Sequence, residues 1–513
     1  MNAKSIVMMV AMAIYLVGMI ILGIVFSRRN RSTSDFYLGG RRLGPLVTAM
    51  SAEASDMSSW LLMGLPGVAL LAGLPEATWT AIGLGVGTYI NWLVVAKRIR
   101  RYSDRLGAIT VPDFFSRRYH DDKHILSLIA ALVIIVFFIP YVASGFNACG
   151  TLFSSLFGVD YFTAMLISAV VILIYTALGG FLAASTSDFV QSIVMTTALI
   201  VVVAFGVHSA GGWANVAENA RSMPGYLNLF QGYDAAAGKA ASYGPIVVLS
   251  TLAWGLGYFG MPHILLRFMA IKDAKKLTLS RRVATIWVFI AMGVAILIGI
   301  VGSGMIANGA VEPLDSANSQ RIIIKIAELL GSHGILAALV AGVILSGILA
   351  ATMSTADSQL LAAASSVTQD LLQDTFKLKI STRTAMIIAR VAVLFIGIIA
   401  IIWARKEGSV FTIVSFAWAG FGAAFGPTML LALFWKKSTK QGAIAGMIVG
   451  GVMIFLWKYG IRPLGGILDI YELLPAFLCG IIANVAVSFA TQHTSAEDLK
   501  EMAQEFDAVK SEL

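Results

Sequence analysis

The stretch Ser51-Ala52-Glu53-Ala54-Ser55-Asp56-Met57-Ser58-Ser59-Trp60, followed by Gly64-Leu65-Pro66-Gly67, decides how the chain is interpreted. It lies in an apolar span over about 46–71, yet it carries two carboxylates and four hydroxyls. A carboxylate at the centre of a bilayer costs roughly 2.5–3.5 kcal/mol on insertion scales, so such acids usually face a cavity, a partner or an ion. Glycine and proline weaken the helical ladder and free backbone carbonyls. The stretch therefore predicts a broken membrane helix whose free oxygens suit a cation, as in many secondary transporters.

The composition is that of a polytopic membrane protein. Of the 513 residues, 58% are hydrophobic and 13% charged, whereas soluble domains carry about 25% charged residues. The net charge of +9 does not indicate nucleic-acid binding, because the basic residues form short clusters between apolar spans. The two cysteines, Cys149 and Cys479, lie inside apolar segments and indicate neither a disulfide framework nor a thiolate metal site.

Apolar runs of about 20 residues predict transmembrane helices. We expect thirteen, at about 6–27, 46–71, 77–96, 125–150, 160–180, 187–207, 246–266, 283–308, 335–365, 384–404, 411–434, 441–459 and 471–491. With the N-terminus outside, 27 of the 37 Lys and Arg fall in cytoplasmic segments, including 28–42, 97–123, 267–282 and 436–440. The positive-inside rule therefore predicts an external N-terminus and a cytoplasmic C-terminus in a cell membrane.

The connections between spans carry few further elements. Residues 208–244 form the longest outer connection, and residues 312–331 have the pattern of a short amphipathic external helix. In the charged tail, 495–513, Leu499, Met502 and Phe506 recur on one side of a predicted cytoplasmic helix.

Weak internal symmetry relates the second and seventh spans. The second is interrupted at Gly64-Leu65-Pro66-Gly67, and the seventh carries the glycine-rich run Trp254-Gly255-Leu256-Gly257-Tyr258-Phe259-Gly260-Met261-Pro262. The start of one lies five spans before the start of the other. This spacing predicts an inverted five-helix repeat in which each copy opens with a broken helix and both breaks meet at the midplane.

The ninth span carries a second group of oxygens. Ser354, Asp357 and Ser358 share one helical face by their i, i+3, i+4 spacing. Hydroxyl and carboxylate oxygens are ligands for hard cations, and we expect sodium to share this preference. The alternative is that the hydroxyls only bond carbonyls of their own or a neighbouring helix. The carboxylate of Asp357 favours the ion-binding interpretation.

Several other residues have two interpretations each. Tyr141, Trp254 and Tyr258 offer aromatic faces with polar tips, which either pack or bind a substrate. Asp188 is either a helix N-cap near the cytoplasmic surface or part of an ion path. Arg41 is a positive-inside anchor or, less favoured by spacing, a gating contact. The three glycines of a G-x-G-x-G pattern, Gly83, Gly85 and Gly87, indicate close helix packing.

Four strings resemble the sodium/solute symporter family, and most closely its proline-transporting branch. They are Ser51-Ala52 with Ala54-Ser55-Asp56-Met57-Ser58, Tyr175-Thr176 with Gly179-Gly180-Phe181, Trp254 to Gly260 with Pro262-His263-Ile264, and Trp418-Ala419-Gly420-Phe421-Gly422-Ala423-Ala424-Phe425-Gly426-Pro427. The resemblance implies an all-α fold with a leucine-transporter-type core of ten helices, preceded by one helix and followed by two. The expected units are 1–45 (first helix and cytoplasmic loop), 46–207 and 246–434 (inverted repeats), 435–491 (two helices) and 492–513 (tail).

The same resemblance implies a function and its site. It implies bacterial import of L-proline with a co-transported sodium ion by alternating access. The sodium site would use backbone carbonyls of Ala54, Met57 and Ala351 and the hydroxyls of Ser354 and Thr355. Asp56 would be the critical acid nearby, with Arg41 on the cytoplasmic pathway. The substrate pocket would draw on Ser58, Trp60, Tyr141, Trp254, Tyr258 and Pro262.

Some features leave alternatives open. Glu53 and Ser59 stand where proline-transporting members commonly have glycine. Asp188, Asp357 and Ser358, with Ser354, resemble the second sodium site of some sialic-acid and sugar members, so one or two sodium ions are expected. The alternative functions are transport of another small solute and a role as a membrane sensor. No nucleophile–base pair or metal triad occurs at usable spacing, so we do not expect an enzyme.

Overall fold

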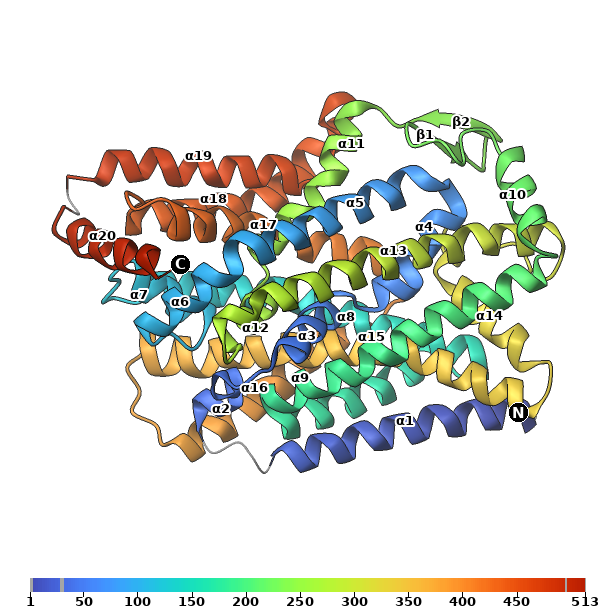
Figure 1. Ribbon diagram of the computed structural model, residues 1–513, viewed down its shortest axis with the longest axis horizontal. Coiled ribbons are helices and arrows are strands. Elements are labelled where there is room, and N and C mark those ends of the chain that lie inside the picture. Colours follow the sequence, from blue (N-terminus) through green and yellow to red (C-terminus); the bar gives the residue numbers. More distant parts are fainter. Residues whose placement is uncertain (1–2, 28–31, 494–495, 513) are drawn as a thin grey trace.

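The computed structural model describes residues 3–27, 32–493 and 496–512, and long helices dominate it (Figure 1). The first half contains α1 (Ala3–Ser27), α2 (Thr33–Leu38), α3 (Pro45–Asp56), α4 (Leu65–Ala72), α5 (Leu74–Ile90), α6 (Ala96–Leu106), α7 (Val111–Arg118), α8 (Ile125–Phe157), α9 (Tyr161–Ser209) and α10 (Trp213–Ser222). The second half contains β1 (Gln231–Asp234), β2 (Lys239–Ser242), α11 (Pro245–Leu252), α12 (Pro262–Ala270), α13 (Leu277–Ala307), α14 (Ile322–Gly331), α15 (Ile335–Ser365), α16 (Thr382–Trp403), α17 (Val410–Phe434), α18 (Lys440–Leu456), α19 (Leu473–Thr491) and α20 (Ala496–Ser511).

The predicted membrane spans correspond to these helices. Within the described residues, ten helices are long and apolar enough to cross a membrane, and the bent pair formed by 245–259 and 262–270 makes eleven. Two of the thirteen predicted spans remain to be placed. One is accounted for by α9, which contains both the fifth and the sixth predicted span. The other is the second predicted span, which is divided between the short helices α3 and α4.

The helix α9 folds back on itself at Gly180. Its 49 residues would extend for about 73 Å if straight, more than twice the roughly 30 Å hydrocarbon core of a bilayer. Gly180 has φ 71° and ψ −179°, a conformation available to glycine, and interrupts the helix. The Tyr175 and Ser187 hydroxyls, twelve residues apart, contact each other across the bend. The predicted boundary between the fifth and sixth spans is therefore confirmed.

The second span is broken as predicted, a few residues earlier than the glycine–proline motif suggests. α3 ends at Asp56, and Met57 has φ −75° and ψ 67°. A π-helical turn over Trp60–Gly64 follows, and α4 then begins with Pro66 in its first turn. The break thus places Met57, Ser58 and Ser59 outside regular helix, directly after Asp56.

The seventh span has the second break. α11 passes into a 3₁₀ segment, Ala253–Phe259, before α12 begins at Pro262, and the two parts are bent by 45°. The segment packs so closely that a Cβ at Gly257 would lie 2.0 Å from the Trp418 Nε1 atom. On the facing helix α5, a Cβ at Gly83 or Gly87 would lie 2.5 Å from backbone atoms of the seventh span. The close-packing prediction for these glycines is confirmed.

The two ends of the helix bundle differ. α10, the β1–β2 hairpin and α14 lie at one end, where α1 also begins, whereas α2, α6, α7 and α20 lie at the other (Figure 1). The predicted external helix corresponds to α14, and the tail helix corresponds to α20, with Met502 and Phe506 buried. The connection 208–244 carries more structure than expected, because α10 and a hairpin pairing Gln231 with Ser242 occupy it.

Candidate ion and substrate site

The broken second span meets α15 through a group of buried oxygens. The Ser354 hydroxyl donates to the carbonyl of Ala54 at 2.7 Å and also lies 3.2 Å from the carbonyl of Ala351. The Thr355 hydroxyl donates to the Ala351 carbonyl at 3.1 Å. The structure therefore brings together four of the five residues predicted to bind sodium, in a buried position.

Met57, the fifth predicted ligand, is the residue at which α3 stops. Its amide donates to the Glu53 carbonyl at 2.7 Å and closes the last helical turn. The next amide, of Ser58, turns back to the Asp56 carbonyl at 2.8 Å. Since the following residues do not continue the α-helical ladder, the carbonyls here are oriented differently from those of an intact helix.

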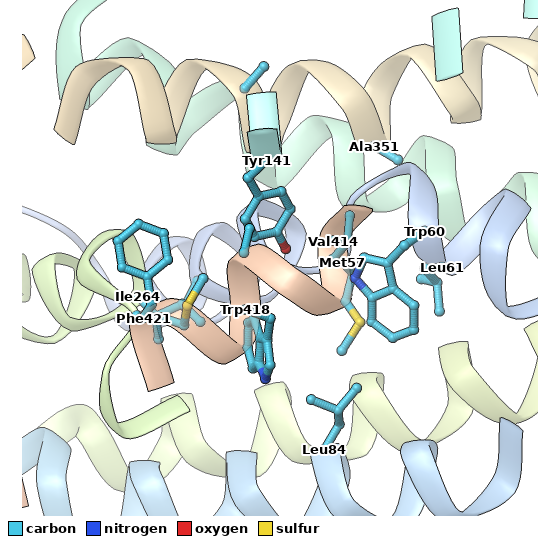
Figure 2. Close-up of a cluster of buried hydrophobic side chains, with 14 of the residues drawn as sticks. Met57, Trp60, Leu61, Leu84, Tyr141, Ile264, Ala351, Val414, Trp418 and Phe421 are labelled. Carbon is cyan, nitrogen blue, oxygen red and sulfur yellow. The ribbon is translucent and has the colours of Figure 1, made fainter. Parts of the chain in front are cut away.

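Asp56 connects this break to three aromatic residues. Its side-chain Oδ2 accepts the Tyr258 hydroxyl at 2.5 Å, and its backbone carbonyl accepts the Trp60 indole N–H at 3.2 Å and the Tyr141 hydroxyl at 3.4 Å. Figure 2 shows Tyr141 with its hydroxyl directed toward the region of Met57 and Trp60. Asp56 is fully buried, and within the described part of the chain its Oδ1 has no partner. The acid predicted to be critical thus links both broken spans.

The predicted aromatic residues form one buried cluster. The ring of Trp254 lies 6.1 Å from Trp60 and stacks on Tyr471 at 5.2 Å. Tyr258 meets Trp418 edge-on at 5.0 Å, and the Trp418 indole donates to the Trp254 carbonyl at 2.7 Å. Tyr471 and Trp418, which extend the cluster, were not among the predicted pocket residues. Pro262 starts α12, which follows the 3₁₀ segment that carries Trp254 and Tyr258.

A crevice too narrow to admit a water molecule lies beside Tyr141. Its lining residues include Ser58, Tyr141, Thr355, Thr352 and Gln359. Both polar atoms of the Gln359 amide are buried and lack a partner among the residues that the structure describes. Sequence reasoning did not single out Gln359 or Thr352, although both lie within a turn of the predicted ligands on the ninth span.

The residues predicted for a second sodium ion surround an arginine. Ser51 donates to Asp188 Oδ2 at 2.6 Å, and the Ser358 hydroxyl lies 3.1 Å from Asp357 Oδ1. Arg267 Nη2 lies 3.2 Å from the same Asp188 oxygen, and both side chains are almost fully buried. The N-cap interpretation of Asp188 is wrong, because Gly180 marks the bend and Asp188 lies well inside the helix that follows.

Arg267 itself was assigned incorrectly from the sequence. Counting it with the cytoplasmic cluster 267–282 places it at the surface, but its side chain is 1% exposed. Apolar residues surround it in the chain, from Ile264 to Leu266 and from Phe268 to Ala270. These apolar neighbours in the sequence distinguish Arg267 from a surface arginine that determines membrane topology.

Arg41 holds several segments of the chain together and is not only a positive charge at the surface. Its guanidinium donates to the carbonyls of Met269 at 2.6 Å and Ala108 at 2.7 Å, and it lies 3.4 Å from the Asp104 carboxylate. Gly39, Gly40 and Arg41 all have positive φ, which directs the side chain inward at a conformational cost for the arginine. Burial lowers the pKa of Arg41 to about 10, with a smaller contribution from Arg100 that Asp104 opposes, so the charge is retained at neutral pH.

Glu53 faces the neighbouring π-helical turn Asn91–Val95. Its Oε1 accepts the indole N–H of Trp92 at 2.8 Å, and the side chain is buried. Ser59, the second departure from the family pattern, is also buried, and its hydroxyl has no partner in the described ranges.

Comparisons with known proteins agree with this architecture. The model of the sodium:solute symporter family matches residues 36–450. The chain is 40% identical to the sodium/proline symporter of Salmonella typhimurium, covering 95% of this chain and 93% of that protein. It is 41% identical to the high-affinity proline transporter PutP of Bacillus subtilis, covering 93% and 97%.

Solved structures show the same fold at low sequence identity. A Na⁺-coupled sialic acid symporter in a substrate-bound outward-open state superimposes with a TM-score of 0.77 at 18% identity, over 94% of this chain and 97% of that one. The nucleobase-cation-symport-1 family transporter Mhp1 in a closed conformation gives a TM-score of 0.54 at 15% identity, over 93% and 99%. The all-α, leucine-transporter-type fold predicted from the sequence is confirmed. The chain belongs to the sodium:solute symporter family.

Proposed function

We propose that the chain is a sodium-coupled carrier that imports L-proline by alternating access. The observation that carries this proposal is the contact between the two oxygen-bearing segments. The Ala54 carbonyl of the broken second span and the Ser354 hydroxyl of α15 meet at 2.7 Å, next to the aromatic cluster. The high identity to proline symporters over nearly the whole chain supports proline as the solute.

The sodium ion would take the place of hydrogen bonds between the two segments. The carbonyls of Ala54, Met57 and Ala351 and the hydroxyls of Ser354 and Thr355 are neutral oxygens, which hard cations accept as ligands. Since the hydroxyls currently donate to two of those carbonyls, an entering ion would be coordinated by groups that already lie together. Sodium would thereby brace α15 against the break in the second span.

Proline would bind on the aromatic side of the same break. Ser58, Trp60, Tyr141, Trp254, Tyr258 and Pro262 are the proposed pocket residues. We propose that the pyrrolidine ring of proline lies against Trp254 and Tyr258. Burial of its apolar surface against the flat aromatic rings would favour binding there. The carboxylate would meet backbone amides that the break leaves without a helical partner, since helix N-termini attract anions.

Asp56 would couple the two ligands. It lies between the Ala54 and Met57 carbonyls in sequence, and it holds Tyr258 of the substrate cluster by its side chain. A change in sodium occupancy would therefore affect the substrate pocket through Asp56. Because coupling free energies are reciprocal, each ligand would tighten the binding of the other by the same factor.

Arg41 would close the cytoplasmic side. It joins the turn after α2 to the end of α12 and to the α6–α7 connection. Opening toward the cytoplasm requires these segments to separate. We therefore propose that breaking the Arg41 contacts is part of the inward-opening step.

The orientation follows from the charge asymmetry. We propose an external N-terminus and a cytoplasmic C-terminus in a bacterial cell membrane, with inverted repeats at 46–207 and 246–434. An inside-negative potential then adds roughly 2.3 kcal/mol per transported charge per 100 mV to import. Transport of unchanged proline, with no catalysed conversion, is the proposed activity.

The test is uptake of labelled proline into proteoliposomes containing the purified chain. An inward sodium gradient should drive accumulation of intact proline, and replacing sodium with potassium on both sides should abolish it. Uptake that proceeds equally in potassium would overturn sodium coupling. Unlabelled amino acids, sugar acids and vitamins added outside identify the substrate, and any of them that competes better than proline would overturn proline as the solute.

A further inference from the structure

A cavity lined by basic side chains lies at the end of the bundle where α6 is found, opposite α10 and the hairpin (Figure 1). Its volume is about 330 Å³, and it separates the turn that joins α5 to α6 from the first turns of α13. Lys97 contributes from α6, Arg281 from α13, and Lys275 from the 3₁₀ turn Ala274–Lys276. None of the eight described residues that line the cavity is acidic. The lining therefore carries an excess of positive charge.

The polar groups of this cavity suit a phosphate. Arg281 places its guanidinium over the Tyr89 ring at 5.3 Å, and its Nε atom is buried with no hydrogen-bond partner in the part of the chain that the structure describes. The Thr278 hydroxyl lies in the same lining. Guanidinium and ammonium groups donate charge-assisted hydrogen bonds to phosphate oxygens, and arginine does so in a fixed planar fork. The arrangement therefore favours an anion with several acceptor oxygens.

One wall of the cavity continues onto the apolar surface of the bundle. Leu93 lines the cavity and is 45% exposed, and the large apolar side chains of Ile90 and Leu279 nearby are exposed as well. Tyr89 is also exposed, as is typical of aromatic residues at the level of the lipid headgroups. A ligand in this cavity would thus place its charge among the basic residues and an apolar part against Leu93.

We propose that the cavity binds the headgroup of an anionic phospholipid from the leaflet at this end of the bundle, which is the cytoplasmic leaflet in the proposed orientation. The lipid phosphate would accept hydrogen bonds from Lys97, Lys275 and Arg281, and the acyl chains would leave past Leu93. Basic pockets between membrane helices on the cytoplasmic side are suited to such headgroups. The proposal does not depend on which solute the chain carries.

The bound lipid would strengthen an existing contact between α6 and the connection 271–276, which joins α12 to α13. Arg100 of α6 already donates to the Ile271 carbonyl of this connection at 2.7 Å. A headgroup held by both Lys97 and Lys275 would add a second link between the same two segments. Because the cavity exists only in the folded chain, binding of the lipid should stabilise the folded protein.

The first test measures the melting temperature of the purified, unmodified chain in a neutral detergent as short-chain lipids are added. Dioctanoyl phosphatidylglycerol should raise it in a saturable manner. Dioctanoyl phosphatidylcholine, which has no net charge, and inorganic phosphate, which has no acyl chain, should raise it much less at the same concentration. An equal shift with phosphatidylcholine would overturn the role of the basic residues. An equal shift with inorganic phosphate would indicate a site for soluble anions and overturn the lipid.

The second test removes the positive charges of the cavity. The triple variant Lys97→Gln, Lys275→Gln and Arg281→Gln should bind dioctanoyl phosphatidylglycerol about a hundredfold more weakly. Each basic residue near a membrane surface contributes about a factor of five to the binding of an anionic lipid, and three are lost. Affinity is read from the lipid concentration that gives half of the maximal rise in melting temperature.

A matched control neutralises three neighbouring cations outside the cavity. Lys272, Lys276 and Arg282 lie in the same segment and are exposed, but they do not line the cavity. Replacing all three with glutamine changes the net charge by the same amount and should weaken lipid binding far less. Equal losses in the two triple variants would show a general attraction to a basic surface and overturn the site.

Photocrosslinking decides the matter if the cavity variant does not fold. Phosphatidylglycerol that carries a diazirine in its headgroup is added to the unmodified protein, and the labelled peptides are identified after illumination. Labels should concentrate in 92–97 and 274–281. Labelling spread equally over another basic segment at the same end, such as 436–440, would contradict the proposal.

Discussion

The hydroxyl of Ser354 donates a 2.7 Å hydrogen bond to the carbonyl of Ala54, a residue 300 positions earlier in the chain. This bond joins the end of α3 to the middle of α15. Both residues are buried, so water does not compete for either group. A single contact therefore connects the first proposed repeat to the second at the place where the sodium site is proposed.

Replacing Ser354 with alanine should weaken sodium binding. The substitution removes one proposed ligand and leaves the Ala54 carbonyl without this donor, and hydrogen bonds to charged groups are worth about 1.5–3 kcal/mol. We expect the sodium concentration for half-maximal proline uptake to rise at least about tenfold. Ser346→Ala is the control, because Ser346 lies on the same helix and donates to the Gly342 carbonyl of its own helix. Equal sodium dependence in both variants would contradict the site assignment.

Replacing Tyr258 with phenylalanine tests the connection through Asp56. The ring remains, but the hydroxyl that Asp56 accepts is lost. A hydrogen bond to a carboxylate is worth about 1.5–3 kcal/mol, so proline affinity at fixed sodium should fall about tenfold or more. Binding of labelled proline to purified protein measures this. Tyr226→Phe, which removes a buried hydroxyl bonded to Ala69 elsewhere, should change affinity little, and the same loss in both variants would count against Asp56 as the coupling residue.

Replacing Arg41 with glutamine should favour opening toward the cytoplasm. The variant loses the contact with Asp104 and most donors to the carbonyls of Met269 and Ala108. A cysteine introduced at Ala108 should then react faster with a thiol reagent added from the cytoplasmic side. Arg42→Gln serves as the control, since the Arg42 side chain is largely exposed and pairs with Asp35. Unchanged cysteine reactivity in the Arg41 variant would argue against a gating role.

Adding a methyl group at Gly257 should disrupt the break in the seventh span. The new Cβ would lie 2.0 Å from Trp418 Nε1, so the indole or the 3₁₀ segment would have to move. Overpacking of this kind typically costs about 1–3 kcal/mol. Gly293→Ala is the opposite case, because nothing lies within 4 Å of that Cβ and alanine favours helix by about 1 kcal/mol. Melting temperatures in detergent should fall for Gly257→Ala and stay level or rise for Gly293→Ala.

The fold was largely predictable because membrane insertion imposes strong patterns. Apolar length located the helices, and Gly180 and Pro262 lie where regular helix is interrupted, whereas the break in the second span falls a few residues before Pro66. The resemblance to the family supplied the expected arrangement of the repeats. Helix α10 and the β1–β2 hairpin were not predicted, since the outer connection over 208–244 carries no hydrophobic pattern that requires them.

The sequence named residues that the structure brings together, but it did not predict their pairings. Sequence spacing identified the oxygen-bearing faces of α3 and α15, yet it could not indicate that Asp56 would bond Tyr258 or that Glu53 would accept Trp92. Arg267 was misassigned because charge clusters are counted by position along the chain, whereas burial depends on which helices surround the residue. Such partners depend on tertiary packing between segments far apart in the sequence.

The most direct test of the central claim is the equilibrium binding of labelled proline to the purified chain as sodium is varied. The proposed coupling predicts that sodium raises proline affinity and proline raises sodium affinity by the same factor, and that potassium does neither. Proline affinity that is the same in sodium and in potassium would contradict it.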